Sequence, residues 1–278
     1  MSNAAVTDID TGIVEAELNY IVDDGKPSIR YIDWPEEEHK ARMPVYQPRT
    51  MPIANGRVAG GPFTLPDHGF TLVNAPTAVT DFFDEDDVKR VYYPETEALI
   101  KAQSGAKRVV VFDHTLRTAD PARHAEGWIR NTVKSVHNDY TERSAPKRLR
   151  DILPANEAEA ALKHRYAIIQ VWRSVAPRVE TEPLAMCDGA TIPATGFISN
   201  QRRYRDRTAE TYHIAHNPAH KWYYFPLMTR DEALVFKVFD TDPSAGVRFT
   251  AHTSFDDPNS PANAAIRESI EMRAFAFF

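Results

Sequence analysis

The sequence predicts a mainly β fold, either a sandwich or a barrel, with a layer of helices contributed by the first half of the chain. Short runs rich in Val, Ile, Tyr, Phe and Trp recur between turn-forming Pro, Gly, Asn and Asp residues. Few stretches have the apolar period of a helix. No internal repeat or linker divides the 278 residues, so we expect a single domain.

The first segments of the chain carry strand and turn signals. Residues 13–33 are expected to form a hairpin of two strands around Asp24 and Gly25. Residues 44–76 contain many prolines and glycines, so we expect irregular structure with short strands there.

Helices are expected at two places, each followed by a buried strand. Residues 84–102 begin with acidic residues and then become periodic, which predicts helical segments broken near Pro94. The β-branched run at 106–116 predicts a strand. Residues 157–164 have the most helical composition, and the Ile, Val and Trp of residues 166–175 predict the strand that follows. Further strands are expected at residues 212–216, 221–225, 233–239, 247–252 and 269–278.

The charge balance argues against a protein that binds nucleic acid. The net charge is -6 and the isoelectric point is about 5.9. The basic clusters at residues 147–150 and 202–205 are short, and solvated surface or a local anion contact accounts for each. We therefore expect a small-molecule partner and no nucleic acid; the sequence leaves the oligomeric state open.

The sequence also lacks signals for secretion or membrane insertion. No apolar run approaches the ~20 residues that span a bilayer, and residues 1–12 lack the basic and then apolar pattern of a secretion signal. The single cysteine, Cys187, cannot form an intramolecular disulfide, and we expect it to be buried and inert rather than nucleophilic. These features predict a cytoplasmic protein without a membrane partner.

A metal site is indicated by the stretch SVHNDYT at residues 135–141. Alternate side chains of a strand point to the same face, so His137 and Asp139 project together. Two histidines and one carboxylate on one face of the metal hold iron in non-haem oxygenases. A simple His–Asp hydrogen bond in a half-buried strand is the alternative that this motif alone leaves open.

The pair at His137 is the better of two candidates. His124 and Glu126 form the same spacing, but they lie in a turn-like setting. His137 instead follows the alternating run 132–136, and a strand gives the rigid support that a metal site needs.

The third ligand must come from a distant strand, and His252 is our candidate because of the motif that follows it. A cluster of three other histidines is expected to be structural, since Pro218 breaks any helix that would align them. This cluster consists of His213, His216 and His220, the last of which is expected to pack against Trp222.

The motif that follows is Arg267-Glu268-Ser269, in a strand-like tail whose alternation puts Arg267 and Ser269 on one face. A 2-oxoglutarate molecule chelates iron through its keto and C1 carboxylate oxygens. Its far carboxylate then needs a cation and a hydroxyl, and a guanidinium binds a carboxylate bidentately. Taken alone, Arg267 would fit a surface salt bridge with Glu271 or Glu268. The order H-x-D, distant His and R-x-S is more specific than any of its parts.

Six blocks of sequence extend this pattern into a resemblance that runs from the first strands to the last residue. They are VHNDYT (136–141), IIQVWRSV (168–175), PLAMCDGAT (183–191), HKWYYFPLMTRDEALVFKVFDT (220–241), AHTSFDDP (251–258) and IRESIEMRAF (266–275). The chain resembles the iron(II)- and 2-oxoglutarate-dependent oxygenases, in the branch that includes the cephalosporin 7-alpha-hydroxylase and the fungal gibberellin desaturase.

The resemblance implies a double-stranded β-helix, which is a cupin-like jelly roll, with flanking helices and iron in the mouth of the barrel. Residues 1–278 would form one oxygenase domain. Its jelly-roll core would occupy about residues 131–278, and the strands and helices of about residues 1–130 would pack on that core.

The resemblance also implies a role for each site residue. The implied iron ligands are His137, Asp139 and His252. The implied 2-oxoglutarate contacts are Arg267, Ser269 and Gln170, the last at a position where asparagine is more usual. The candidates to line the substrate pocket are Tyr140, Trp172 and Arg173, although a core tryptophan and a structurally paired arginine fit the last two equally well.

The implied activity is hydroxylation or desaturation of an unactivated C–H site of a small molecule in natural-product metabolism, with Fe(II), 2-oxoglutarate and O2. Two other classes remain open. A zinc or iron hydrolase or isomerase on a cupin-like barrel would leave Arg267 and Ser269 without a purpose. In a jelly-roll binding protein without enzymatic activity, the histidines would serve only packing and hydrogen bonding.

Overall fold

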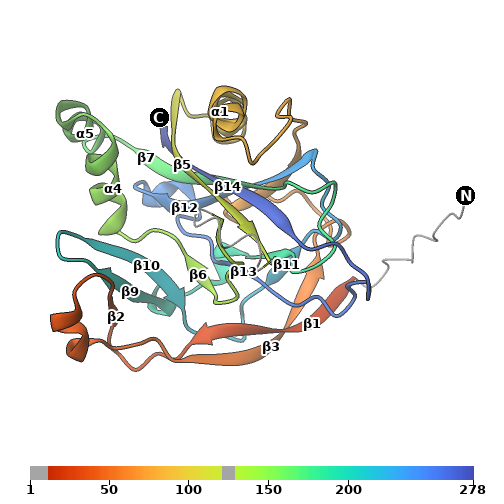
Figure 1. Ribbon diagram of the computed structural model, residues 1–278, viewed down its shortest axis with the longest axis horizontal. Coiled ribbons are helices and arrows are strands. Elements are labelled where there is room, and N and C mark those ends of the chain that lie inside the picture. The colour runs from red at the N-terminus through yellow and green to blue at the C-terminus, as the bar shows by residue number, and fades with distance from the viewer. Residues whose placement is uncertain (1–11, 121–128) are drawn as a thin grey trace, which may run out of the picture.

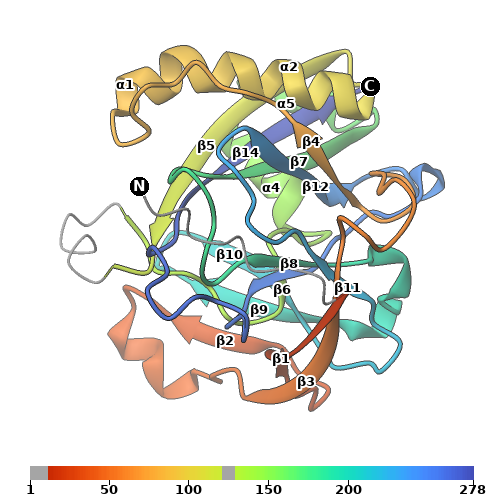
Figure 2. The ribbon, with the colours of Figure 1, turned by 90° about the vertical axis from the view of Figure 1, so that its right-hand side faces the viewer.

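Two facing β-sheets form the body of the protein in the computed structural model, which describes residues 12–120 and 129–278 (Figure 1). Helices cover the outer face of the smaller sheet (Figure 2). This mainly β architecture with flanking helices confirms the predicted fold class. Within the described residues, no helix is both long and apolar enough to span a bilayer.

The larger sheet has nine strands, and it contains strands from both halves of the chain. Most neighbouring strands are antiparallel, but β11 with β3 and β2 with β9 are parallel pairs. The order across the sheet is β1 (Ile13–Ile21), β3 (Tyr46–Asn55), β11 (Trp222–Tyr224), β8 (Leu184–Cys187), β13 (His252–Ser254), β6 (His137–Asn138), β10 (Thr208–Ile214), β9 (Phe197–Arg203) and β2 (Ser28–Tyr31).

The smaller sheet has five antiparallel strands, and its central strands are buried on both faces. Alternation divides their side chains between two cores. Ile169 and Val171 pack toward the helices, whereas Ile168 and Trp172 pack between the sheets. The order is β4 (Phe70–Asn74), β12 (Glu232–Asp240), β7 (Tyr166–Ser174), β14 (Glu268–Phe277) and β5 (Arg108–Thr118).

The helical layer comes mainly from the first half of the chain, as predicted. A short helix α1 (Glu85–Asp87) and a π-helical turn (Val88–Tyr92) lead into α2 (Tyr93–Ser104), which contacts β5, β7 and β14. Pro94 comes just after the π-helical turn, and because it has no N–H it cannot continue the regular i→i−4 ladder, so the irregular helix there agrees with the break predicted near Pro94. Gly105 ends α2 with a φ of 74°, in the left-handed region that glycine adopts without strain. Two further helices, α4 (Ser144–Ile152) and α5 (Ala155–Ala161), pack against each other.

The hairpin predicted at residues 13–33 is wrong, although both of its strands exist. Strand β1 pairs along its whole length with β3, and β2 pairs with β9. Strand β3 offers β1 nine paired positions, with Val14 opposite Ile53 and Ala16 opposite Met51. The four-residue β2 could not bury that apolar face.

The irregular structure predicted at residues 44–76 is only partly correct, since β3 is a regular strand of ten residues. Strand β11 pairs with β3 only at residues 53–55. The remaining edge of β3 therefore tolerates Pro48 and Pro52, because a proline at a sheet edge loses no ladder hydrogen bond.

The strand predicted at residues 247–252 is also wrong, since β13 begins only at His252. The preceding backbone bonds to loops and side chains instead. The Val247 N–H donates to the Pro66 carbonyl, and the Thr250 N–H donates to Asn138 Oδ1. Apart from the run 132–136, which does not form a strand, the other strands and helices predicted from the sequence are present with shifted ends.

Candidate metal centre

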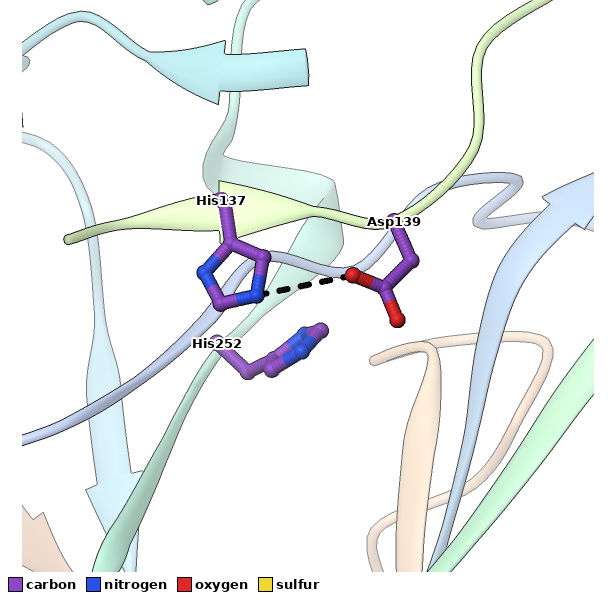
Figure 3. A group of neighbouring side chains, drawn as sticks. All are labelled: His137, Asp139 and His252. Carbon is purple, nitrogen blue, oxygen red and sulfur yellow. Dashed lines mark ion pairs between the residues drawn. The ribbon is translucent and has the colours of Figure 1, made fainter. Parts of the chain in front are cut away.

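The candidate metal ligands meet on the inner face of the nine-stranded sheet (Figure 3). His137 lies on β6, directly opposite His252 of β13 on one side and His213 of β10 on the other. Directly opposed residues of antiparallel strands point to the same face. All three imidazoles therefore face the same space, and Asp139 joins them from the residue after β6.

The geometry of His137, Asp139 and His252 fits a metal ion. One ligand atom from each residue lies within 4.8 Å of the others. The rings of the two histidines are 4.4 Å apart, and His137 Nε2 lies 3.5 Å from Asp139 Oδ1. Figure 3 shows the three side chains turned toward one another.

The hydrogen bonds of the two histidines use Nδ1 and leave Nε2 of each ring available to a metal. His137 Nδ1 lies 2.7 Å from the Ser135 carbonyl, so it carries the proton and Nε2 keeps its lone pair. His252 Nδ1 lies 3.4 Å from the Thr250 carbonyl. His252 Nε2 is buried without a hydrogen-bond partner among the described residues. A buried polar atom that lacks a partner fits a ligand position for an ion.

The electrostatics of the cluster favour the protonation states that a metal requires. Burial, with a smaller effect of the neighbouring His252, lowers the pKa of His137 to about 4. Burial also lowers the pKa of His252. Burial acts to raise the pKa of Asp139, but Arg273 and the two histidines outweigh it and hold that pKa below its usual value. At neutral pH the site therefore offers two neutral imidazoles and one carboxylate.

The opposite sheet orients the carboxylate of Asp139. Gln170 on β7 donates from Nε2 to Asp139 Oδ2 at 2.7 Å, and Arg273 on β14 lies 3.3 Å from the same oxygen. These contacts occupy Oδ2, so the other oxygen of the carboxylate, Oδ1, faces His137. The Oε1 atom of Gln170 is buried without a partner among the described residues, so it can still meet a bound ligand.

We expect Gln170→Leu to weaken iron(II) binding by roughly 10- to 100-fold, because outer partners that orient a metal ligand contribute about that much. Gln170→Glu would place a second carboxylate beside Asp139, so Leu is the cleaner change. Titration of the apoprotein with Fe(II) under nitrogen measures the effect. Asn200→Leu, which removes an amide that bonds to His213 and not to Asp139, is the control, and equal affinities for both variants would contradict this role.

Two of the predicted co-substrate residues lie at β14: Arg267 directly precedes the strand, and Ser269 is on its inner face. Arg267 is 2% exposed, so it does not form the surface salt bridge that the sequence left open. Its Nη1 donates to the Glu182 carbonyl at 2.6 Å and to Ser254 Oγ at 3.0 Å. Arg267 Nε and Ser269 Oγ are buried, and each lacks a hydrogen-bond partner among the described residues.

A narrow recess connects Arg267 with the metal centre. Its volume is about 10 Å³, and both His137 and His252 line it together with Arg267 and Trp172. Burial lowers the pKa of Arg267 to about 10, so its guanidinium stays charged at neutral pH. The structure thus places a buried cation with a free N–H next to the predicted metal ligands.

The three candidates for the substrate pocket have different surroundings. Tyr140 lines a large cavity of about 740 Å³ that also includes His137 and Asp139. Trp172 faces the recess between the sheets. Arg173 follows Trp172 on β7, so it points to the opposite face.

The prediction for Arg173 must therefore be corrected. Its guanidinium donates to Tyr92 Oη, the Ala75 carbonyl and the Arg230 carbonyl, each at 2.8 Å. These contacts fix the helical layer on the outer face of the sheet. Arg173 is the structurally paired arginine that the sequence offered as the alternative.

The histidines assigned structural roles are not all remote from the site. His220 stacks on Tyr20, whose hydroxyl also accepts from Trp222 Nε1 at 2.7 Å. His213, however, lines the large cavity and lies 2.9 Å from Tyr46 Oη. Burial and the nearby His137 lower the pKa of His213 to about 3, so it is neutral. His124 and Glu126, the rejected pair, lie outside the described residues.

Two arginines near the centre make contacts that the sequence did not reveal. Arg273 contacts the carboxylates of Asp139, Asp113 and Glu271. Arg117 lines both the cavity and the recess. Both lie on strands whose pairing in space is invisible in a single sequence, although Arg273 does share the alternating face of Arg267. Cys187 is buried, and burial raises the pKa of its thiol.

Comparison with known proteins identifies the family. Residues 18–277 match a family model described as Oxidoreductase/YMDC permease-like domain. The chain is 32% identical to "Hydroxylase/desaturase efuI" of Hormonema carpetanum, over 95% of each chain. It is 30% identical to "Alpha-ketoglutarate-dependent dioxygenase phiK" of a fungal species, over 78% of this chain and 80% of that protein. The chain therefore belongs to this family of iron(II)- and 2-oxoglutarate-dependent oxygenases, which confirms the family inferred from the sequence.

A solved structure supports the fold. The iron and alpha-ketoglutarate-dependent endoperoxidase NvfI superimposes with a TM-score of 0.85, covering 96% of this chain and 98% of that one at 24% identity. At this level of identity the likeness establishes the fold alone. It confirms the double-stranded β-helix expected from the sequence.

Proposed function

We propose that the chain is an iron(II)- and 2-oxoglutarate-dependent dioxygenase that hydroxylates or desaturates a small molecule in natural-product metabolism, with His137, Asp139 and His252 as the iron ligands. The observation that carries this proposal is the meeting of three ligand atoms within 4.8 Å at the wall of a large cavity. The relatives named as dioxygenase and hydroxylase/desaturase support the chemistry.

The co-substrate is proposed to bind between the two sheets. Arg267 and Ser269 would hold the far carboxylate of 2-oxoglutarate, because their free Nε and Oγ atoms are buried donors beside the metal ligands. The Oε1 atom of Gln170 is a further contact for the co-substrate. A hydrolase without 2-oxoglutarate would leave these buried atoms unpaired, at a cost that native proteins avoid.

The residues of this chain orient the reactants and exclude water. Iron(II), 2-oxoglutarate and O2 supply the oxidising power that breaks an unactivated C–H bond. Gln170 and Arg273 fix the carboxylate of Asp139. Trp172, together with the apolar side chain of Leu184, closes the recess around His252. Tyr140 lines the cavity in which the substrate would lie.

The proposal also covers the domain organisation, the size of the substrate and the place in the cell. We propose that residues 1–278 act as one oxygenase domain, in which strands from about residues 1–130 extend both sheets of the core. The substrate is a small molecule, in keeping with a cavity of about 740 Å³. The protein is proposed to work in the cytoplasm without a nucleic-acid or membrane partner.

Turnover of 2-oxoglutarate tests this proposal. The purified protein should form succinate from 2-oxoglutarate slowly even without its substrate, and formation should need both added Fe(II) and O2. A chelator should stop succinate formation, and Fe(II) should restore it whereas Zn(II) should not. A rate of succinate formation that the chelator does not change would count against the proposal.

A further inference from the structure

Two arginines stand side by side at the far end of the cavity. Arg30 on β2 and Arg202 on β9 are paired in register, and both line the cavity. Neither side chain forms an ion pair or a hydrogen bond with any residue of the described ranges 12–120 and 129–278. Both side chains are exposed to solvent, and like charges directly opposite each other in a sheet are unfavourable, so a bound anion would relieve their repulsion.

The register of the sheet places this pair on the same face as the metal centre. His137 is opposite His213, and His213 is opposite Ile198 on β9. Arg202 lies four residues beyond Ile198, an even step, so it shares the inner face. A strand spacing of about 4.8 Å and a rise of about 3.3 Å per residue put the Cα of Arg202 roughly 16 Å from that of His137. A guanidinium that reaches inward can hold one end of a substrate whose other end lies at the metal.

The acidic residues of the cavity cannot neutralise these arginines, because each already has a cationic partner. Asp113 pairs with Arg148 at 2.7 Å, and Glu210 pairs with Arg143 at 2.7 Å. Asp151 likewise pairs with Lys147. The cavity is therefore positively charged at this end, although the whole chain carries a net charge of -6. A cleft lined by one sign of charge concentrates ligands of the opposite sign.

We propose that Arg30 and Arg202 bind a carboxylate of the substrate, so that the enzyme acts on an organic acid anchored by its charge at the end of the cavity remote from iron. This inference rests on the proposed function. The anchor is distinct from Arg267, which is buried on the opposite sheet at the metal centre. Adjacent guanidinium forks suit a carboxylate because each can donate two parallel N–H groups.

Pairs of ligands that differ only in charge test the proposal. Suitable pairs are 1-naphthaleneacetic acid with 1-naphthaleneacetamide, and 1-adamantanecarboxylic acid with 1-adamantanecarboxamide. Binding is measured by isothermal titration calorimetry under nitrogen. The Fe(II)-loaded protein is kept at saturating 2-oxoglutarate, so that the 2-oxoglutarate clamp formed by Arg267 and Ser269 is already occupied. We expect at least one acid to bind about tenfold or more tightly than its amide.

The double variant Arg30→Gln/Arg202→Gln should abolish that preference by weakening the acid alone. Its control is Lys101→Gln/Lys107→Gln, which makes the same change in net charge at exposed positions outside the cavity and should keep the preference. The proposal is overturned if no acid binds more tightly than its amide, or if the double variant retains the preference. Binding of 2-oxoglutarate to the wild-type protein, followed separately, shows whether a failure lies in the proposed function instead.

Discussion

Replacing His252 with alanine is expected to lower the affinity for iron(II) by at least about 100-fold while the protein stays folded. The reason is that one of only three protein ligands is lost, and partners that merely orient a ligand already contribute about 10- to 100-fold. His137→Ala and Asp139→Ala should do the same. Fe(II) titration under nitrogen measures the affinity, and circular dichroism with thermal melting checks the fold.

Two other histidines provide controls of different stringency. His216 is exposed and forms a T-shaped ring contact with Tyr20, so His216→Ala should bind iron normally. His213 is the stricter control, because it shares the face of His137 but bonds to Tyr46 and Asn200. If His213→Ala lost iron while His252→Ala kept it, our choice of ligands would be wrong.

Arg267→Ala is expected to raise the KM for 2-oxoglutarate steeply while iron binding remains largely intact. Removing one partner of a desolvated charge pair costs roughly 2 to 5 kcal/mol, which corresponds to about 30-fold to several thousandfold in affinity. Ser269→Ala should have a smaller effect, since a hydrogen bond to a charged group contributes about 1.5 to 3 kcal/mol. Succinate formation against 2-oxoglutarate concentration gives both values.

Arg273 is the competing candidate for the clamp, because it lies on the same face of β14. Its guanidinium already contacts Asp113, Thr115 and Glu271, whereas Arg267 keeps a buried N–H without a partner in the described chain. We therefore expect Arg273→Ala to disturb Asp139 and iron binding more than the KM for 2-oxoglutarate. An unchanged KM in Arg267→Ala together with a large rise in Arg273→Ala would move the clamp to Arg273.

The parts of the site that the sequence predicted are those encoded by local patterns. The spacing of His137 and Asp139 predicted that they would meet, but the strand expected at residues 132–136 is absent: β6 is only His137–Asn138, and Asp139 follows it. Arg267 likewise lies just before β14, on which Ser269 stands. The alternation of a strand should have separated Trp172 from Arg173, since adjacent residues of β7 face different cores. The role of Gln170 beside Asp139 depends on the facing of two sheets, which a single sequence does not reveal.

Long-range pairing limited the prediction of the fold in the same way. The short strands β6, β8 and β13 have few residues of their own, and they exist because neighbours complete their ladders. Strand β1 pairs with β3 and not with β2 across the turn at Gly25, because β3 buries the apolar face of β1 better. Arg30 and Arg202, far apart in sequence, became neighbours only through the parallel pairing of β2 with β9.

The absorption spectrum of the anaerobic protein tests the central claim most directly. Protein reconstituted with Fe(II) under nitrogen and then given 2-oxoglutarate should develop the weak visible charge-transfer band of a keto acid chelated to iron. The band should be lost in His252→Ala and should need much more 2-oxoglutarate in Arg267→Ala. A wild-type protein that binds Fe(II) but develops no band at any concentration of 2-oxoglutarate would contradict the assignment of this site.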